Sequence, residues 1–248
     1  MIRSAHAAAA VTMKILKSDL AHGHELEGVV VVIDVLRSFT TAAYAFAGGA
    51  RAVIPAHTLD EIHDLRSRYP RSLTTGALGG GAQVQGLDFG NSPSQVSGLD
   101  LSGITLIQFT AGGVRGLIDC DHASEVLAGS LVCAHATAAY IHRLDADTVT
   151  FVITGLWTDR DGDEDHACAD LIEAYLLGRS PDVTAFERRV RQSDFGRRFG
   201  DAAYPHLPVS DLDHAAAANR FGFAMPMHRT DHGLVIEPVA LAEMPSAN

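Results

Sequence analysis

Short apolar runs alternate along the chain with segments of helical patterning. Residues 29–33 are five aliphatic side chains in a row, and residues 148–154 form a second long run rich in apolar side chains. Such runs are typical of strands that are buried on both faces of a sheet. Shorter runs predict further strands at 52–55, 73–75, 104–108 and 124–128.

The segments between these runs are expected to be helices. Thr58 and Glu61 have the spacing of a capping box, and Gly178 can end a helix. Helices are expected at 39–47, 58–68, 113–118, 133–144 and 164–177, followed from 181 by a mostly helical tail that ends in short extended pieces. This alternation predicts one α/β domain over residues 1–248, a mainly parallel sheet in a three-layer α/β/α, Rossmann-like arrangement. Residues 1–12 are expected to be a ragged N-terminus.

Composition narrows the class of partner. The chain carries 30 acidic and 19 basic residues, a formal net charge of −11. Nucleic-acid-binding proteins usually present a basic face, so no nucleic-acid partner is expected. No apolar run approaches the ~20 residues that a membrane-spanning helix needs, and we expect a cytoplasmic protein with no membrane partner. The three cysteines show no CxxC spacing, which argues against a disulfide framework and a structural zinc site. A monomer and a homodimer both stay open.

Polar and glycine residues follow several of the predicted strands. Ligands of parallel sheets bind beyond the carboxyl ends of the strands, so these residues are expected to converge on one edge. The candidate site residues are Asp34, Arg37, Asp88, Asn91, Ser92, Gly112, Gly113, Glu164 and Asp165. Carboxylates suit a hard cation such as Mg²⁺, a guanidinium binds phosphate through its planar fork, and glycines let backbone N–H groups approach an anion. Together they predict a metal-assisted phosphoryl site.

The roles divide by chemistry. The candidate Mg²⁺ ligands are Asp34, Asp88, Glu164 and Asp165, and these four with Arg37 are the candidate catalytic residues. The candidate residues for binding phosphate or the rest of the substrate are Arg37, Asn91, Ser92, Gly112 and Gly113. The expected partner is a small anionic phosphate ester.

Each of these residues also has an ordinary structural role as an alternative. Asp34 can cap the following helix, Arg37 can be a surface charge, and the acidic stretch 159–165 can be a solvated loop. Familiar motifs of other enzyme classes are missing: the chain has neither GxxxxGK[ST] nor GxSxG, and the residues after Asp34 do not continue DxDx[TV]. The functional interpretation therefore depends on the convergence of separate segments.

Three segments resemble the 2-phosphosulfolactate phosphatase family. Residues 33–38, IDVLRS, resemble its IDVLRAT, residues 86–93, GLDFGNSP, are similar to its GFDLGNSP, and residues 164–169, EDHACA, to its EDDLCAG. Residues 127–131 and the stretch from Asp211 to Pro226 fit further segments, so the resemblance extends from about 28 to 227. The residues that match motif positions are Asp34, Arg37, Asp88, Asn91, Ser92, Glu164 and Asp165.

The resemblance implies a three-layer α/β/α fold and Mg²⁺-dependent hydrolysis of 2-phospho-3-sulfolactate to 3-sulfolactate and phosphate, on the route to coenzyme M. The chain departs from the family pattern at three places. The family's Gly-Glu-Arg is here Gly76-Ala77-Leu78, its Thr-Thr-Asn-Gly-Thr is here residues 110–114, TAGGV, and the second Asp of its EDD is His166.

We predict that these departures lie on the rim of the site and weaken recognition of 2-phosphosulfolactate. Two hypotheses follow. The first is a phosphatase with poor turnover of the family substrate and better turnover of a less anionic phosphate ester. The second is a non-catalytic paralogue that binds a small anion.

Overall fold

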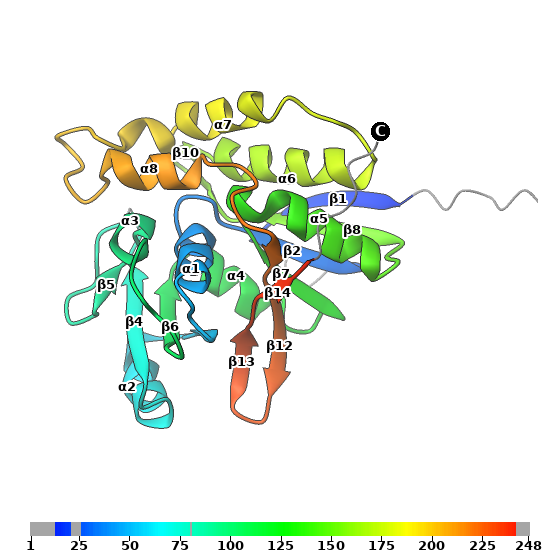
Figure 1. Ribbon diagram of the computed structural model, residues 1–248. Coiled ribbons are helices and arrows are strands. Elements are labelled where there is room, and N and C mark those ends of the chain that lie inside the picture. Colours follow the sequence, from blue (N-terminus) through cyan, green and yellow to red (C-terminus); the bar gives the residue numbers. More distant parts are fainter. Residues whose placement is uncertain (1–12, 21–25, 80, 242–248) are drawn as a thin grey trace, which may run out of the picture.

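A ten-stranded sheet forms the centre of the molecule (Figure 1). The computed structural model describes residues 13–20, 26–79 and 81–241, so the expected ragged N-terminus at 1–12 lies outside the described residues. In order across the sheet the strands are β1 (Lys14–Asp19), β8 (Thr148–Ile153), β2 (Val29–Ile33), β7 (Glu125–Gly129), β12 (Pro226–Thr230), β13 (Gly233–Ile236), β3 (Ala52–Pro55), β6 (Thr105–Thr110), β4 (Ser72–Ala77) and β5 (Phe89–Gly90). Two short pairs lie apart from it, β9 (Leu156–Trp157) with β10 (Arg160–Asp161), and β11 (Phe223–Ala224) with β14 (Val239–Ala240).

Helices connect the strands and cover the sheet. They are α1 (Ser38–Ala47), α2 (Leu59–Arg68), α3 (Pro93–Val96), α4 (Gly113–Asp119), α5 (Ala134–Arg143), α6 (Asp163–Leu176), α7 (Val183–Gln192) and α8 (Val209–Ala215), with short 3₁₀ turns at Leu131–Cys133 and Gly196–Arg198. Figure 1 shows α6, α7 and α8 together along one side of the molecule, while the β12–β13 hairpin extends on the opposite side. No helix in the described part is long and apolar enough to cross a membrane.

The predicted fold class is confirmed: the sheet is mainly parallel, and helices pack on both of its faces. Strands β1, β8, β2 and β7 are parallel to one another, and so are β3, β6, β4 and β5. The hairpin β12–β13 stands between these two sets and is antiparallel to β7 and to β3. The sequence predicted only short extended pieces here, because the residues of a hairpin do not indicate between which strands of a sheet it lies.

The apolar run at 29–33 is explained by burial on both faces of β2. Val29, Val31 and Ile33 belong to the core that β2 shares with α5 and α6. Val30 and Val32 belong to the opposite core, shared with α1 and α4. Successive side chains of a strand point to opposite faces, so a strand covered by helices on both sides needs apolar residues at every position.

The start of α2 shows the predicted cap. The Thr58 hydroxyl accepts a hydrogen bond from the Glu61 N–H at 3.2 Å. The Glu61 carboxylate in turn accepts the N–H of His57 at 2.7 Å, one residue before the position that a capping box uses. Ile62 and Leu65 of this helix pack on β3 in a third, smaller core.

Candidate active site

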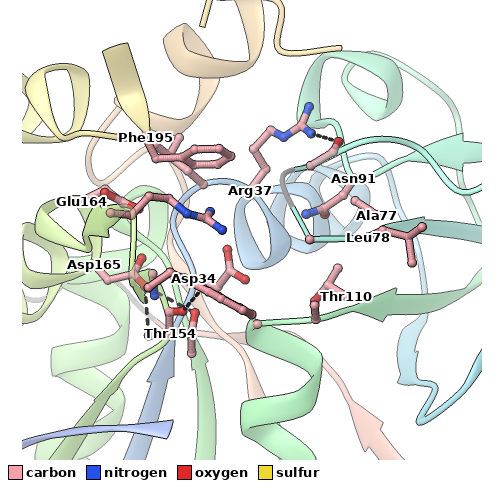
Figure 2. Close-up of a pocket in the computed structure, with 18 residues that line it drawn as sticks. Asp34, Arg37, Ala77, Leu78, Asn91, Thr110, Thr154, Glu164, Asp165 and Phe195 are labelled. Carbon is pink, nitrogen blue, oxygen red and sulfur yellow. Dashed lines mark hydrogen bonds between the residues drawn. The ribbon is translucent and has the colours of Figure 1, made fainter. Parts of the chain in front are cut away.

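One pocket collects residues from segments that are far apart in the sequence (Figure 2). It lies where β2, β8, β4 and β6 end, as expected for ligand sites of parallel sheets. Its lining is Asp34, Leu36, Arg37, Ala77, Leu78, Gly79, Gly81, Asn91, Thr110, Ala111, Gly112, Thr154, Gly155, Trp157, Arg160, Glu164, Asp165 and Phe195. The structure therefore brings six of the nine predicted site residues together: Asp34, Arg37, Asn91, Gly112, Glu164 and Asp165.

Asp34 stands directly after β2 and is nearly buried, with 9% of its surface exposed. Its Oδ1 accepts the N–H of Ser38 at 3.0 Å, at the first residue of α1, and its Oδ2 accepts the N–H of Gly113 at 2.8 Å. The ordinary role considered for Asp34, a helix cap, is therefore present. Each oxygen has further lone pairs, and Figure 2 shows the carboxylate directed into the pocket. Burial raises the pKa of Asp34 above its ordinary value, while the two N–H groups and the charge of Arg160 act in the opposite direction.

Glu164 and Asp165 are adjacent at the start of α6 and have different surroundings. Asp165 Oδ1 accepts the N–H of Val35 at 2.8 Å, and its Oδ2 accepts the N–H groups of Thr154 and Gly155 at 3.1 and 2.7 Å. Asp165 thereby ties the segments that follow β2 and β8 to α6. Glu164 is 2% exposed, and its Oε2 has no hydrogen-bond partner among the residues that the structure describes.

Both carboxyls are destabilised in their charged form. Burial raises the pKa of Glu164 to about 7. Burial also raises the pKa of Asp165 well above its ordinary value, and the neighbouring charges of Glu164 and Asp34 raise it further. Three acidic side chains therefore share a small, poorly solvated volume. A bound cation would relieve both the desolvation and the repulsion.

Arg37 lines the pocket, but its guanidinium is directed at protein acceptors. Nη1 donates to Asp211 Oδ2 at 2.6 Å and to the carbonyl of His206 at 3.3 Å. Nη2 donates to the carbonyl of Gly81 at 2.6 Å. Figure 2 shows this side chain turned away from Asp34 and toward the side of the pocket where Asn91 lies. The guanidinium that was expected to bind phosphate therefore donates its hydrogen bonds to other groups of the protein.

Asp88 and Ser92 lie outside this pocket. Asp88 Oδ2 accepts the N–H and the hydroxyl of Thr74, both at 2.8 Å, and lies 3.6 Å from Arg66 Nη1. Asp88 comes immediately before β5, at the amino end of that strand, and this explains why it does not join the carboxylates at the carboxyl ends. The Ser92 hydroxyl donates to Asp211 Oδ1 at 2.7 Å. These bonds assign both residues to bracing the loop around β5.

Of the two glycines after β6, Gly113 is required by the packing of Asp34 and Gly112 has little room for a side chain. A Cβ built on Gly113 would lie 2.8 Å from Asp34 Oδ2, and one on Gly112 would lie 3.2 Å from the same atom. The first separation is too short for any side chain without displacement of Asp34. The N–H of Gly113 donates to that carboxylate and so helps to orient Asp34. Gly113 itself does not line the pocket.

Sequence reasoning missed one cationic residue of the pocket, Arg160. It begins β10, and its guanidinium lies over the rings of Phe195 and Trp157, 4.4 and 5.3 Å from their centroids. The signal in the sequence was an arginine three residues after an aromatic side chain, within a loop that was interpreted from its acids alone.

Unpartnered polar atoms gather in this pocket. In the described part of the chain, five buried side-chain nitrogen or oxygen atoms have no hydrogen-bond partner, on Asn91, Gln108, Thr137, Arg160 and Glu164. Three of these atoms, Asn91 Oδ1, Arg160 Nε and Glu164 Oε2, belong to residues that line the pocket. Leaving such groups unpaired costs free energy, so their concentration at one place points to a polar ligand.

The departures from the family pattern fall largely on the same walls. Of the residues that depart from the pattern, Ala77, Leu78, Ala111 and Gly112 line the pocket, as predicted, whereas Val114 and His166 do not. Those that line it offer only aliphatic carbon and backbone. Leu78 has 52% of its surface exposed, although it is a large apolar residue.

The carboxylates of the pocket suit a divalent ion such as Mg²⁺ that is bound partly by the protein and partly by the substrate. Among the described residues, no three His, Cys, Asp or Glu side chains are arranged to enclose a metal ion. Mg²⁺ commonly binds through one or two carboxylates together with waters and phosphate oxygens of the substrate. Glu164 Oε2 has no partner among the described residues, and each oxygen of Asp34 accepts a single N–H group, whereas Asp165 Oδ2 accepts two N–H groups and is the least available to an ion. The unpartnered, buried Oε2 of Glu164 is the observation that favours a cation here.

Comparisons with known proteins identify relatives of this chain. The family described as 2-phosphosulpholactate phosphatase matches residues 15–198. A protein of Bacillus subtilis (strain 168) named "Probable 2-phosphosulfolactate phosphatase" is 31% identical over 224 residues, which cover 89% of this chain and 96% of the relative. Proteins of the same name from Gloeobacter violaceus and Deinococcus radiodurans are 36% and 33% identical, over 61% and 65% of this chain and 64% and 67% of the relatives.

Proposed function

The chain belongs to the 2-phosphosulfolactate phosphatase family, and on this basis we propose that it hydrolyses a small phosphate monoester at the pocket beyond β2, β8, β4 and β6. The observation that carries the proposal is the convergence there of Asp34, Glu164 and Arg160 with unpartnered polar atoms. Arg160 would contact the anionic phosphoryl group, and a divalent ion between that group and the carboxylates would offset their mutual repulsion.

In the hydrolysis of a phosphate monoester, the protein contributes mainly by positioning the reacting groups and by stabilising the charge of the transition state. Asp34 and Glu164 would hold Mg²⁺, which when bound neutralises charge on the phosphoryl oxygens. Asp34 is fixed in orientation because each of its oxygens accepts a backbone N–H. Asp165 fixes the ends of β2 and β8 relative to α6, and so keeps the two carboxylates in register.

The walls of the pocket support a substrate with less charge than the one in the relatives' name. Ala77 and Leu78 contribute no charge or hydrogen-bond donor from their side chains. A charged group of the substrate that loses its partner loses roughly 1–3 kcal/mol of binding. We therefore propose a phosphate monoester whose organic part carries fewer anionic groups than 2-phosphosulfolactate.

A phosphate-release assay over a panel of small phosphorylated acids tests the proposal. Wild-type protein with Mg²⁺ is expected to release phosphate from at least one ester and to stop when the ion is chelated. Asp34→Asn should lower kcat at least 100-fold, while Asp60→Asn, an exposed control on α2, should not change it. Saturable binding of phosphate esters without release from any of them would instead establish the non-catalytic, anion-binding paralogue.

A further inference from the structure

Arg160 is held at the pocket by two aromatic rings. Its guanidinium carbon lies 4.4 Å from the ring centroid of Phe195 and 5.3 Å from that of Trp157. The side chain is only 12% exposed. Stacking on aromatic faces restricts a guanidinium while leaving its in-plane N–H groups available, because the rings contact its face. The contact therefore orients Arg160 without using its donors.

Among the described residues, Arg160 forms no ion pair within 4 Å with a buried carboxylate, although its charge acts on Asp34 and Glu164 from a longer distance. The acidic atom that lies within 4 Å is Asp159 Oδ1, 3.8 Å from Nε, which is longer than a hydrogen bond. Asp159 is 64% exposed, and its other oxygen accepts Arg198 Nη2 at 3.0 Å. Nε of Arg160 has no hydrogen-bond partner in the described part of the chain. A buried guanidinium with an unpartnered N–H group favours the binding of an anion that is not part of the protein.

Arg37, in contrast to Arg160, is already paired with groups of the protein. Its partner Asp211 is fully buried, and both terminal nitrogens of Arg37 donate to acceptors of the protein. A phosphate that bound Nη1 and Nη2 of Arg37 together would compete with these acceptors, the buried carboxylate of Asp211 among them. Arg160 can bind the same anion without breaking any hydrogen bond.

We propose that Arg160, and not Arg37, is the residue that binds the phosphoryl group of the substrate. The identity of the anion rests on the proposed function, but the binding role of Arg160 does not require turnover. Arg37 then braces the fold at the edge of the site through Asp211. The β9–β10 hairpin, which carries both Trp157 and Arg160, becomes part of the ligand site.

Trp157 provides a direct probe because it is the single tryptophan of the chain. Titration of the wild-type protein with inorganic phosphate in Mg²⁺ buffer should change its intrinsic fluorescence in a saturable way. Arg160→Gln should raise the apparent Kd for phosphate at least tenfold. Arg160→Lys should also weaken binding, because an ammonium keeps the charge and loses the planar fork. Calorimetry on the same samples reports binding independently of the probe.

The control variants separate the two arginines. Arg37→Lys should lower the melting temperature and leave the Kd for phosphate within threefold of the wild type at a temperature where both are folded. Arg51→Gln, at an exposed position, should change neither. The proposal is overturned if Arg160→Gln binds phosphate as tightly as the wild type, if Arg37→Lys loses binding while Arg160→Gln retains it, or if the wild type shows no binding by fluorescence or by calorimetry. Binding that depends on Arg160, with no ester hydrolysed, would leave this inference standing and remove only the proposed activity.

Discussion

Arg37 and Asp211 form a buried ion pair across 174 residues of sequence, with Nη1 donating to Oδ2 at 2.6 Å. The other oxygen of Asp211 accepts the hydroxyl of Ser92 and both the N–H and the hydroxyl of Ser94. The pair therefore joins the loop after β2 to the start of α3 and to α8. A carboxylate with this many donors compensates for the desolvation of the guanidinium.

Removal of Asp211 should destabilise the protein strongly. Asp211→Ala leaves the charge of Arg37 buried and unpaired, which typically costs about 3–5 kcal/mol of the free energy of unfolding. Urea unfolding monitored by circular dichroism measures this loss. Asp211→Asn, which keeps the shape and an acceptor oxygen, should lose less and serves as a second variant if Asp211→Ala does not fold.

Asp213→Ala is the matched control for this experiment. Asp213 lies on the same helix and pairs with Arg191 at 2.6 Å, but it is 57% exposed. Exposed ion pairs contribute about 0–1 kcal/mol, so this variant should change stability little. Equal losses for Asp211→Ala and Asp213→Ala would refute the distinction that the structure makes between them.

Glu164 should make the metal-free protein less stable as the pH rises. Burial raises its pKa from 4.5 to about 7, so folding favours the protonated form. For a carboxyl with a raised pKa, the stabilising contribution is complete below the unfolded pKa and is lost as the pH rises through the folded one. Between pH 4.5 and 7 the loss amounts to about 3 kcal/mol for this group. Asp34 and Asp165, whose pKa values are also raised, act in the same direction.

Glu164→Gln should therefore remove much of this pH dependence. In the presence of a chelator, the variant should be more stable than the wild type at pH 8 and similar to it at pH 4.5, as measured by urea unfolding. The control Glu237→Gln alters an exposed carboxyl near His228 and should leave the wild-type pH profile unchanged. Parallel pH profiles for Glu164→Gln and the wild type would show that Glu164 is not held in a costly charged state.

The sequence predicted that Asp34, Glu164 and Asp165 lie together at one pocket, because polar residues just beyond the carboxyl ends of strands can be recognised locally, and the roles of these carboxyls stay predictions. Asp34 follows an unmistakable buried strand, and Glu164 and Asp165 lie in the first turn of a helix that follows another one. Strand β1 was missed because it pairs only with β8, at the edge of the sheet, and its side chains are partly exposed.

The remaining features depend on partners that no local pattern reveals. Asp211 was noted as part of a similar segment without a role, since its partner Arg37 is 174 residues away. Arg160 looked like one charge in a solvated loop until the fold placed Phe195 against it. Asp88 was expected among the carboxylates because it follows a predicted strand through a glycine-rich loop and also matches a family motif, yet its carboxylate accepts the N–H and the hydroxyl of Thr74.

Substrate preference should follow the uncharged wall at Ala77 and Leu78. The wild type should turn over 2-phosphosulfolactate poorly relative to a 2-phospho acid that lacks the sulfonate. Leu78→Arg supplies a cation at an exposed position of the wall and should shift the kcat/KM ratio toward the sulfonated ester about tenfold or more, since ~1.4 kcal/mol corresponds to a factor of ten. Leu99→Arg, also at an exposed leucine but outside the pocket, should leave the ratio unchanged. A wild-type kcat/KM for 2-phosphosulfolactate of ~10⁴ M⁻¹s⁻¹ or more would show that these positions do not govern recognition.

In the proposed reaction, water attacks the phosphorus of an ester bound between Asp34, Glu164 and Arg160. Phosphorus NMR of the reaction in ¹⁸O-enriched water tests it most directly, because it detects both release of phosphate and the bond that breaks. The wild type with Mg²⁺ should produce phosphate that carries one solvent oxygen, and Asp34→Asn should produce it at least 100-fold more slowly. Release of phosphate without solvent oxygen, or no release from any small phosphate ester by the folded wild-type protein, would contradict the account.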